Sequence, residues 1–306
     1  PAGLTWEVRT TGNANNGGAY INLIPGTSVD YSQQNASQLS VSDGACLLAS
    51  VTLTSVIGGF TAGMVGNVIQ IRAGGVNFVV GFYEIVLVNS PNSVNLDRTP
   101  VAAGNGTGGL GEVGGALASP ETFILSAVSG NTCFVKSGTY NFTASRTFTN
   151  TYTGIFGYDT SRSVAPTGNN RPLFALGAFF ITTPSTGVQL KNLRFTGSGT
   201  QLILGSGSNE LYLNCQFENT NSAGNRYCIL YTLSTPTPCA IIDCEFSGTP
   251  GATSTGYFWS IGDPFLHGGN VIIMFSFFHD LTVGISHSNY KNGLCTIKNI
   301  FARIGS

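Results

Sequence analysis

Two carboxylates that stand two positions apart, Asp243 and Glu245, have the clearest potential for chemistry. If both lie on one β-strand, they share a face and their Cα atoms are roughly 6.5–7 Å apart. Carboxyl groups at about that separation can serve as the acid and the base of an inverting glycosidase. Glu218 and Asp263 are expected on nearby loops and complete the set of candidate catalytic acids. The pattern raises the hypothesis that the chain hydrolyses polysaccharide.

The same Asp-x-Glu pair has a structural interpretation, which we favour: on the outside of a strand it forms a solvated face. No Gly-x-Ser-x-Gly nucleophile elbow accompanies it. His267, His279 and His287 are separated by 12 and 8 residues, not by the one-turn spacing of a helical zinc pair. We therefore predict no catalytic residue, no metal site and no cofactor.

Three consecutive aromatic residues, Tyr257, Phe258 and Trp259, lie in a stretch that we expect to be a loop. Aromatic side chains with a polar atom are suited to partly exposed contacts. This cluster could stack on a sugar ring or contact a partner protein; alternatively, it covers the edge of the core.

A glycine-rich stretch between residues 101 and 115 contains the pattern G-x-G-x-x-G at Gly109–Gly114. A dinucleotide site would need a strand before the pattern, a helix after it and an acid about 20 residues later. An Asn/Gly-rich segment precedes it, and Cys133 to Lys136 occupy the later position. We interpret residues 101–115 as a linker.

The elements that would position these side chains are indicated by a short sequence motif, here called the phrase, that is repeated in the last third of the chain. It occupies residues 188–195, 211–217 and 240–246, and two less similar copies begin at Val271 and Cys295. Its aromatics Phe195, Phe217 and Phe246 are 22 and 29 residues apart. Each phrase alternates as a half-buried strand does, and a period of about 20–50 residues is typical of a solenoid. We predict an all-β fold, a parallel β-helix.

Stacking the phrases at the usual spacing of about 4.8 Å places like residues on like. No coil can bury its apolar face alone, but stacked neighbours share one core. The predicted inward columns are Leu193, Cys215, Cys244 and Phe195, Phe217, Phe246; the outward ones are Asn192, Asn214, Asp243 and Arg194, Gln216, Glu245.

The composition of the 306-residue chain fits a long β structure. Charged residues make up only 9%, against roughly 25% in ordinary domains, and a net charge of −1 gives no electrostatic footprint for nucleic acid or an anionic membrane. No apolar run approaches the roughly 20 residues of a membrane span, and no secretory signal is visible. The seven cysteines lack Cys-x-x-Cys spacing, so we expect reduced core thiols, no disulfides and synthesis in a reducing cytoplasm.

Four segments are predicted. Residues 1–45 form strands and loops, and residues 46–100 form a small antiparallel β subdomain with a turn at Asn89–Ser93. Residues 101–115 are the linker, and residues 116–306 form the solenoid. Ala116–Ala127 is expected to be a short helix or turn that caps the first coil.

The phrase from Thr132 to Tyr140, a strand, a glycine turn and a second strand, resembles the entry coil of right-handed parallel β-helices of the pectate-lyase-like kind. The stretches Thr5–Gly18, Asp30–Gln34 and Met64–Asn67 resemble β-helix proteins of bacteriophage virions. Such proteins are capsid decoration proteins, head fibres, tail fibres or tailspikes. The resemblance implies a right-handed helix with an N-terminal β-rich region, and a homotrimer.

Pectate-lyase-like enzymes cleave acidic polysaccharides with clustered acids, and some carry a His-Gly pair with an Arg-x-Lys phrase. This chain has His267-Gly268 but neither an Asp-Asp pair nor an Arg-x-Lys phrase. We regard the His-Gly pair as coincidence.

We therefore expect a non-catalytic structural protein of a tailed-phage virion, made in the host cytoplasm, whose partners are other copies of itself and other virion proteins. The alternative is a tailspike-like receptor-binding module, glycoside hydrolase or polysaccharide lyase that acts on host surface glycans. A bacterial extracellular adhesin is a third possibility.

The last coil has an apolar end. Ile300, Phe301 and Ile304 lie in it without a visible cap, and leaving each in water costs roughly 1.5–3 kcal/mol. We expect this end to be covered by another copy, another protein or further chain.

Overall fold

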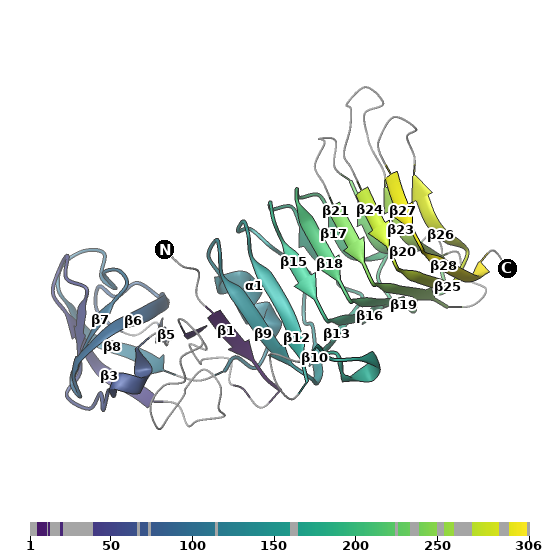
Figure 1. Cartoon of the computed structure of the whole chain (residues 1–306). Coiled ribbons are helices and arrows are strands. Elements are labelled where there is room, and N and C mark those ends of the chain that lie inside the picture. The colour runs from purple at the N-terminus through teal and green to yellow at the C-terminus, as the bar shows by residue number, and fades with distance from the viewer. Residues whose placement is uncertain are drawn as a thin grey trace. The chain divides into compact units, whose positions relative to one another are not determined.

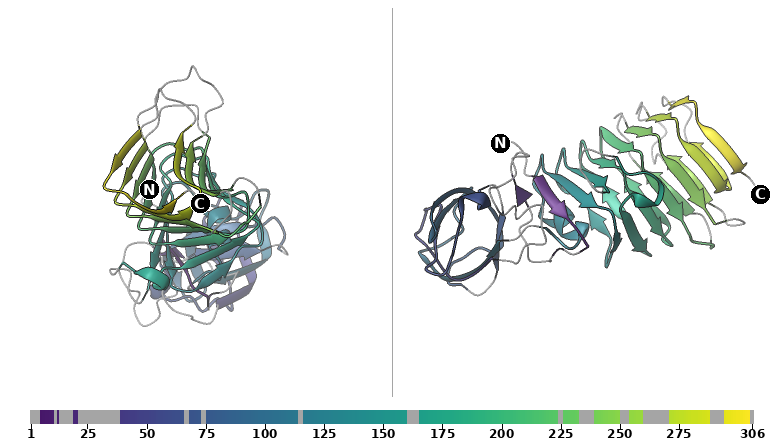
Figure 2. Two further views of the ribbon diagram at one scale, coloured as in Figure 1. Left: turned by 90° about the vertical axis from the view of Figure 1, so that its right-hand side faces the viewer. Right: turned by 60° about the horizontal axis from the view of Figure 1, so that its bottom comes forward.

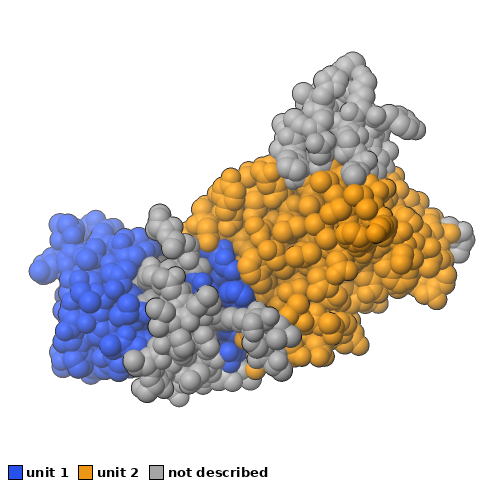
Figure 3. Space-filling model, viewed as in Figure 1, with its two compact units in different colours: residues 1–126, 131–134 blue, residues 127–130, 135–306 orange. Residues whose placement is uncertain are grey.

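The computed structural model describes residues 5–10, 12, 19–20, 39–65, 68–72, 75–113, 116–159, 165–223, 226–232, 239–249, 254–259, 271–287 and 294–304. The chain divides into two compact units (Figure 3). Unit 1 comprises residues 1–126 and 131–134, and unit 2 comprises residues 127–130 and 135–306. Of the helices described, none is long and apolar enough to cross a membrane.

Unit 1 contains a closed barrel of six antiparallel strands, seen as a ring in Figure 2. Alternate side chains of its strands, such as Ile69, Ile71, Tyr83 and Ile85, are buried in one core. Around the barrel the strands follow the order β3 (Leu39–Cys46), β4 (Thr52–Thr54), β7 (Ser93–Leu96), β6 (Gly81–Ser90), β5 (Val68–Arg72) and β8 (Gly106–Val113). A 3-10 turn, η1 (Ala62–Met64), lies between β4 and β5.

The barrel corrects two predicted segments. Its first strand begins inside the segment predicted as residues 1–45, and the predicted linker 101–115 contains strand β8. The glycines of β8 allow close packing: a Cβ atom on Gly109 would lie 2.7 Å from the Phe78 ring. The G-x-G-x-x-G pattern therefore belongs to a barrel strand. The predicted hairpin is confirmed, since β6 and β7 pair as antiparallel neighbours across Pro91 and Asn92.

Elsewhere in the described part of unit 1, β1 (Thr5–Val8) pairs antiparallel with β2 (Ala19–Tyr20), and α1 (Pro120–Ser126) follows the barrel in the chain. Trp6 packs edge-on against Phe123, with 6.0 Å between the ring centroids. Its indole Nε1 donates to Asn131 Oδ1 at 2.9 Å. The predicted strand near Thr5 and the short helix within 116–127 are both confirmed; that the helix caps a coil stays a prediction.

Unit 2 is a solenoid of three parallel sheets (Figure 1). In this unit the first sheet contains β12 (Gly154–Tyr158), β15 (Gln189–Lys191), β18 (Glu210–Leu213), β21 (Cys239–Ile242), β24 (Val271–Met274) and β27 (Leu294–Ile297). The second contains β10 (Thr139–Asn141), β13 (Leu173–Gly177), β16 (Arg194–Gly197), β19 (Gln216–Asn219), β22 (Glu245–Gly248), β25 (Phe277–Leu281) and β28 (Ile300–Ile304). The third contains β11 (Arg146–Thr147), β14 (Ile181–Thr183), β17 (Gln201–Gly205), β20 (Arg226–Tyr231), β23 (Ser254–Trp259) and β26 (Val283–His287).

The chain visits the three sheets in turn and then returns to the first, so each circuit adds one strand to every sheet. This is a parallel β-helix, as predicted. Strand β9 (Thr132–Lys136) spans the boundary of the two units, and a 3-10 turn, η2 (Gly168–Asn170), follows β12.

A column of stacked phenylalanines fills the solenoid core. From Phe195 through Phe217, Phe246 and Phe278 to Phe301, successive ring centroids are 5.0, 5.1, 4.6 and 5.0 Å apart. The predicted inward column is therefore confirmed. The two less similar copies of the motif align with the others through Phe278 and Phe301. Leu193, Cys215 and Cys244 are buried in the neighbouring inward column, also as predicted.

The core cysteines act as small apolar residues with weak thiol donors. Cys244 Sγ donates to the carbonyl oxygens of Tyr212 and Ile242, and burial raises the pKa of this thiol well above its ordinary value. The absence of disulfides stays a prediction for the chain.

Candidate functional site

Three of the candidate acids, Glu218, Asp243 and Glu245, lie on or beside the outer face of the second sheet. Glu218 belongs to strand β19 and not, as predicted from the sequence, to a loop. Because side chains alternate along each strand, Phe217 and Phe246 point inward while Glu218 and Glu245 point outward. Glu245 aligns with Phe277 on the next coil, and Glu218 aligns with Ser247. Glu218 and Glu245 are thus one coil and two residues apart, roughly 8 Å between Cα atoms.

Asp243 does not share a strand with Glu245, so that part of the carboxylate prediction is wrong. It lies in the turn between β21 and β22 with a positive φ of 53°. Asn192, Asn214, Phe275 and Lys298 occupy the same turn in other coils, with φ from 49° to 59°. Asn and Asp tolerate this left-handed conformation better than other side chains do, which explains their presence. We call this line of residues the corner column.

The corner column also links coils by hydrogen bonds. Asn214 Nδ2 donates to Asn192 Oδ1 at 2.8 Å. Arg171 Nη2 in turn donates to Asn214 Oδ1. The outward Asn192–Asn214–Asp243 column predicted from the repeat therefore exists, but it forms the turn between two sheets and not a strand face.

The structure brings Glu245 together with His279, a contact that the sequence analysis did not predict. His279 Nε2 lies 3.0 Å from Glu245 Oε1, and His279 Nδ1 lies 2.8 Å from Asp280 Oδ2. Arg303 Nη2 donates to the same Asp280 oxygen at 2.6 Å. These four residues, which we call the ion cluster, join β22, β25 and β28.

The ion cluster favours a protonated imidazole. Burial lowers the pKa of His279, but its hydrogen bonds to Asp280 and Glu245 outweigh burial and raise the pKa above the ordinary value. The hydrogen bond from His279 lowers the pKa of Asp280, and Arg303 lowers it further. When both ring nitrogens donate, the imidazolium has no lone pair to accept a proton. This arrangement is better suited to linking neighbouring coils than to acting as a general base in catalysis.

A carboxylate that sequence reasoning missed, Glu210, lies inside the solenoid and is 2% exposed. Its Oε1 accepts from the backbone N–H of Gly207 at 3.0 Å, and its Oε2 accepts from the hydroxyl of Tyr212 at 2.8 Å. Burial raises the pKa of Glu210 to about 7, although these hydrogen bonds lower it in part. The alternation Glu210, Leu211, Tyr212 could have shown that Glu210 shares the inward face. A buried position keeps it away from large substrates.

The aromatic cluster also differs from the prediction. Tyr257, Phe258 and Trp259 belong to strand β23, where they pair with Ile229, Leu230 and Tyr231 of the preceding coil. They are not on a loop. Asp263, the fourth candidate acid, lies outside the described residues, and so does the His267-Gly268 pair.

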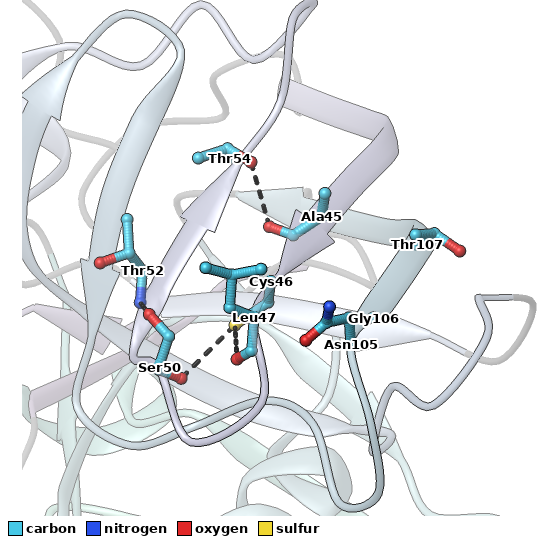
Figure 4. A pocket seen from close by; sticks show the side chains of 9 residues that line it. All are labelled: Ala45, Cys46, Leu47, Ser50, Thr52, Thr54, Asn105, Gly106 and Thr107. Carbon is cyan, nitrogen blue, oxygen red and sulfur yellow. Dashed lines mark hydrogen bonds between the residues drawn. The ribbon is translucent and has the colours of Figure 1, made fainter.

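A pocket of about 280 Å³ lies on the barrel of unit 1 (Figure 4). Ser50 Oγ accepts from the Thr52 backbone N–H, and Asn105 Oδ1 accepts from that of Leu48. The thiol of Cys46 donates to the carbonyls of Leu47 and Ser50, and burial raises its pKa. With no carboxylate, imidazole or amine in its lining, this pocket is not suited to acid–base chemistry. It is lined by Ala45, Cys46, Leu47, Ser50, Thr52, Thr54, Asn105, Gly106 and Thr107.

Within the described ranges, no group of three or more His, Cys, Asp or Glu side chains could hold a metal ion. The absence of a metal or cofactor remains a prediction for the chain as a whole.

No protein-family model matches the chain, and no curated protein matches it. Among solved structures, the catalytic domain of a GH87 α-1,3-glucanase variant in complex with tetrasaccharides aligns with 87% of this chain at 11% identity and a TM-score of 0.29. The tailspike protein gp49 from Pseudomonas phage LKA1 aligns with 88% at 11% identity and a TM-score of 0.21. The alignments cover 60% and 61% of those two chains, so this chain spans about three fifths of their length. Structural similarities with such low identity and TM-scores carry no information on the activity or partners of this chain.

Proposed function

We propose that this chain is a non-catalytic structural protein of a tailed-phage virion, of the decoration, head-fibre or tail-fibre type, in which the solenoid is a rigid rod. The observation that carries the proposal is the use made of the outward polar side chains. Asp243 forms a turn, and Glu245 and Asp280 hold a protonated His279 across coils. Of the candidate acids, Glu245 thus connects one coil to the next and Asp243 shapes a turn.

Three features join successive coils, which is what a rod under mechanical load requires. The phenylalanine column stacks inside, the asparagines of the corner column bond to each other, and the ion cluster spans three coils. The phenylalanine stacking repeats along the axis, so stability is distributed over nearest-neighbour contacts.

The proposed partners are other copies of the chain, as a homotrimer, and other virion proteins. The proposed location of the protein is the virion, after its synthesis in the host cytoplasm. These points rest on the resemblance of the N-terminal stretches to virion proteins. Light scattering of the purified protein should give about 96 kDa, three times the 31.9 kDa chain; a monomer mass would contradict the trimer.

Antibody labelling of purified phage particles that encode the chain tests the virion role directly. Labelling at a fixed position with a constant copy number is expected. A chain confined to the infected cell, with none on washed particles, would overturn the proposal.

The second candidate function is binding of host surface glycan. It is favoured by Phe277, which is 37% exposed beside the ion cluster, and by Phe275, which is 51% exposed and precedes it by two residues. Phe277 also stacks on His279, with 4.6 Å between the ring centroids. Aromatic faces next to carboxylates suit sugar rings and their hydroxyl groups. Glycan-array binding that Phe277→Ala abolishes and Phe156→Ala leaves intact would support it; no binding would reject it.

A further inference from the structure

The pocket on the barrel of unit 1 is shaped by a tightly held turn between β3 and β4. In this turn the backbone N–H of Ser50 donates to the carbonyl oxygen of Leu47 at 3.0 Å. Ala49 has a left-handed conformation with a φ of 61°, and the backbone N–H of Leu48 donates to Asn105 Oδ1 at the start of β8. These bonds fix the walls of the pocket in advance, so a ligand does not have to order them.

The lining of the pocket is uncharged and mostly apolar. None of its nine residues is Asp, Glu, Lys, Arg or His. An ionised ligand group buried against this lining would have no charged partner, which is strongly unfavourable. The pocket therefore disfavours carboxylates, phosphates and amines, and it favours an uncharged group with an apolar part.

Two side chains of the lining keep hydrogen-bond donors for a ligand. Because Asn105 Oδ1 accepts from Leu48, the orientation of the amide is defined and Nδ2 carries the donors. No group in the described part of the chain accepts from this Nδ2, and the Asn105 side chain points toward Leu47 (Figure 4). Ser50 Oγ accepts from the Thr52 N–H, so its own hydrogen can also be donated to a ligand.

These groups match the chemistry of an acetamido substituent. Its carbonyl oxygen can accept from Asn105 or Ser50, and its methyl group suits a wall formed by Ala45 and Leu47. Its N–H can donate to Thr54 Oγ1, which donates to the Ala45 carbonyl oxygen and keeps its lone pairs. A sugar with only hydroxyl groups would bury several donors here with few acceptors, which is unfavourable.

The size of the pocket and the topology of the barrel favour a sugar as the carrier of this group. A volume of about 280 Å³ is just below the range of roughly 300–1,000 Å³ of sites for drug-sized ligands, so the pocket accommodates a single ring or substituent. Peptides also contain amides, but β structures commonly bind them by adding a strand to an open edge. The barrel is closed and offers no such edge. Leu47 and Leu48, 66% and 53% exposed, provide apolar surface for the ring beside the pocket.

We propose that this pocket binds the acetamido group of an N-acetylated amino sugar. Asn105 and Ser50 donate to its carbonyl oxygen, and the apolar wall receives its methyl group. The proposal does not depend on the virion role. It concerns a site on unit 1, whereas the second candidate function uses Phe277 of unit 2.

An NMR titration of the full chain with three methyl glycosides tests the proposal. The glycoside of N-acetylglucosamine should bind at least about tenfold more tightly than that of glucose, which has a hydroxyl group at the same position. The glycoside of glucosamine, which has a charged amine there, should bind no more tightly than that of glucose.

Four variants locate the binding. Asn105→Asp keeps an oxygen that accepts from Leu48 but loses both hydrogens of Nδ2, and it should remove the preference for the acetylated sugar. Ala45→Leu, which fills the pocket, should remove the preference independently. Asn92→Asp, the same exchange in the turn between β6 and β7, should leave it unchanged, and so should Phe277→Ala. Circular dichroism should show that all four variants keep their sheet content.

Equal binding of the acetylated sugar and glucose, or binding of neither, would overturn the proposal. A preference that survives either Asn105→Asp or Ala45→Leu would also overturn it, because the sugar would then lie elsewhere. So would a preference lost in Phe277→Ala. Tighter binding of N-acetylalanine N-methylamide than of the acetylated sugar would show that the pocket is a peptide site and not a sugar site.

Discussion

Replacing Glu210 by glutamine should remove a large pH dependence from the stability of the solenoid. The carboxyl group is 2% exposed inside the core, where it accepts hydrogen bonds from Gly207 and Tyr212. Burial raises its pKa from 4.5 to about 7. Glutamine keeps the shape and can keep both contacts if the Tyr212 hydroxyl turns to accept from the new amide and to donate to Thr183.

The sign and magnitude of this pH dependence follow from the linkage between proton binding and folding. Because the folded-state pKa lies above the unfolded value, the folded state binds the proton more tightly. The resulting stability is fully present below pH 4.5 and is lost as the pH rises through about 7. A difference of roughly 2.5 pKa units at about 1.4 kcal/mol per unit gives about 3 kcal/mol.

The assay is urea unfolding of both proteins between about pH 4.5 and 8.5. Glutamine does not ionise, so the stability of the variant relative to the natural chain should rise by about 3 kcal/mol across this range. Asp43 and Asp280, whose pKa values are lowered, act in the opposite direction but cancel between the two proteins. Glu218→Gln, on the outer face, is the control for a Glu-to-Gln exchange outside the core. A pH-independent difference for Glu210→Gln would refute the reasoning.

Three further predictions concern the ties between coils. Phe246→Ala should cost about 3–5 kcal/mol in urea unfolding, because its ring stacks on both sides in a closed core; a cost below about 1 kcal/mol would contradict the column. His279 has a raised pKa, so its contribution is full below pH 6.5 and is lost as the pH rises above that value; NMR titration should place its midpoint above 6.5, and a midpoint below it would exclude the ion cluster. Asp243→Val should cost roughly 1–2 kcal/mol because of its left-handed backbone, whereas Asp243→Asn should be nearly neutral; equal costs would show that the charge, not the backbone, matters there.

The repeat alone predicted the solenoid and its inward columns, because stacking like residues on like leaves little freedom once Phe195, Phe217 and Phe246 are aligned. It failed at Asp243 because alternation was continued through a turn, where the left-handed residue shifts the phase between β21 and β22. Inward and outward residues alternate only within each strand.

The barrel was misread for a related reason. Glycines that are normally a sign of flexibility are required in β8 by the close approach of Phe78. The ion cluster could not be predicted, because Glu245 and His279 are 34 residues apart and meet only through the coil register. Glu210 carried a sequence signal in its spacing from Tyr212, but a buried carboxylate contradicts ordinary burial preferences.

The central claim is that Glu245 helps to hold coils together and that the chain does not cleave substrate. The most direct test is incubation of the purified chain with host capsule or lipopolysaccharide, followed by quantification of released reducing ends and unsaturated sugars. The account predicts no release above a heat-inactivated control, for the natural chain as for Glu245→Gln and Glu218→Gln. Release of oligosaccharide by the natural chain that either substitution abolished would contradict it.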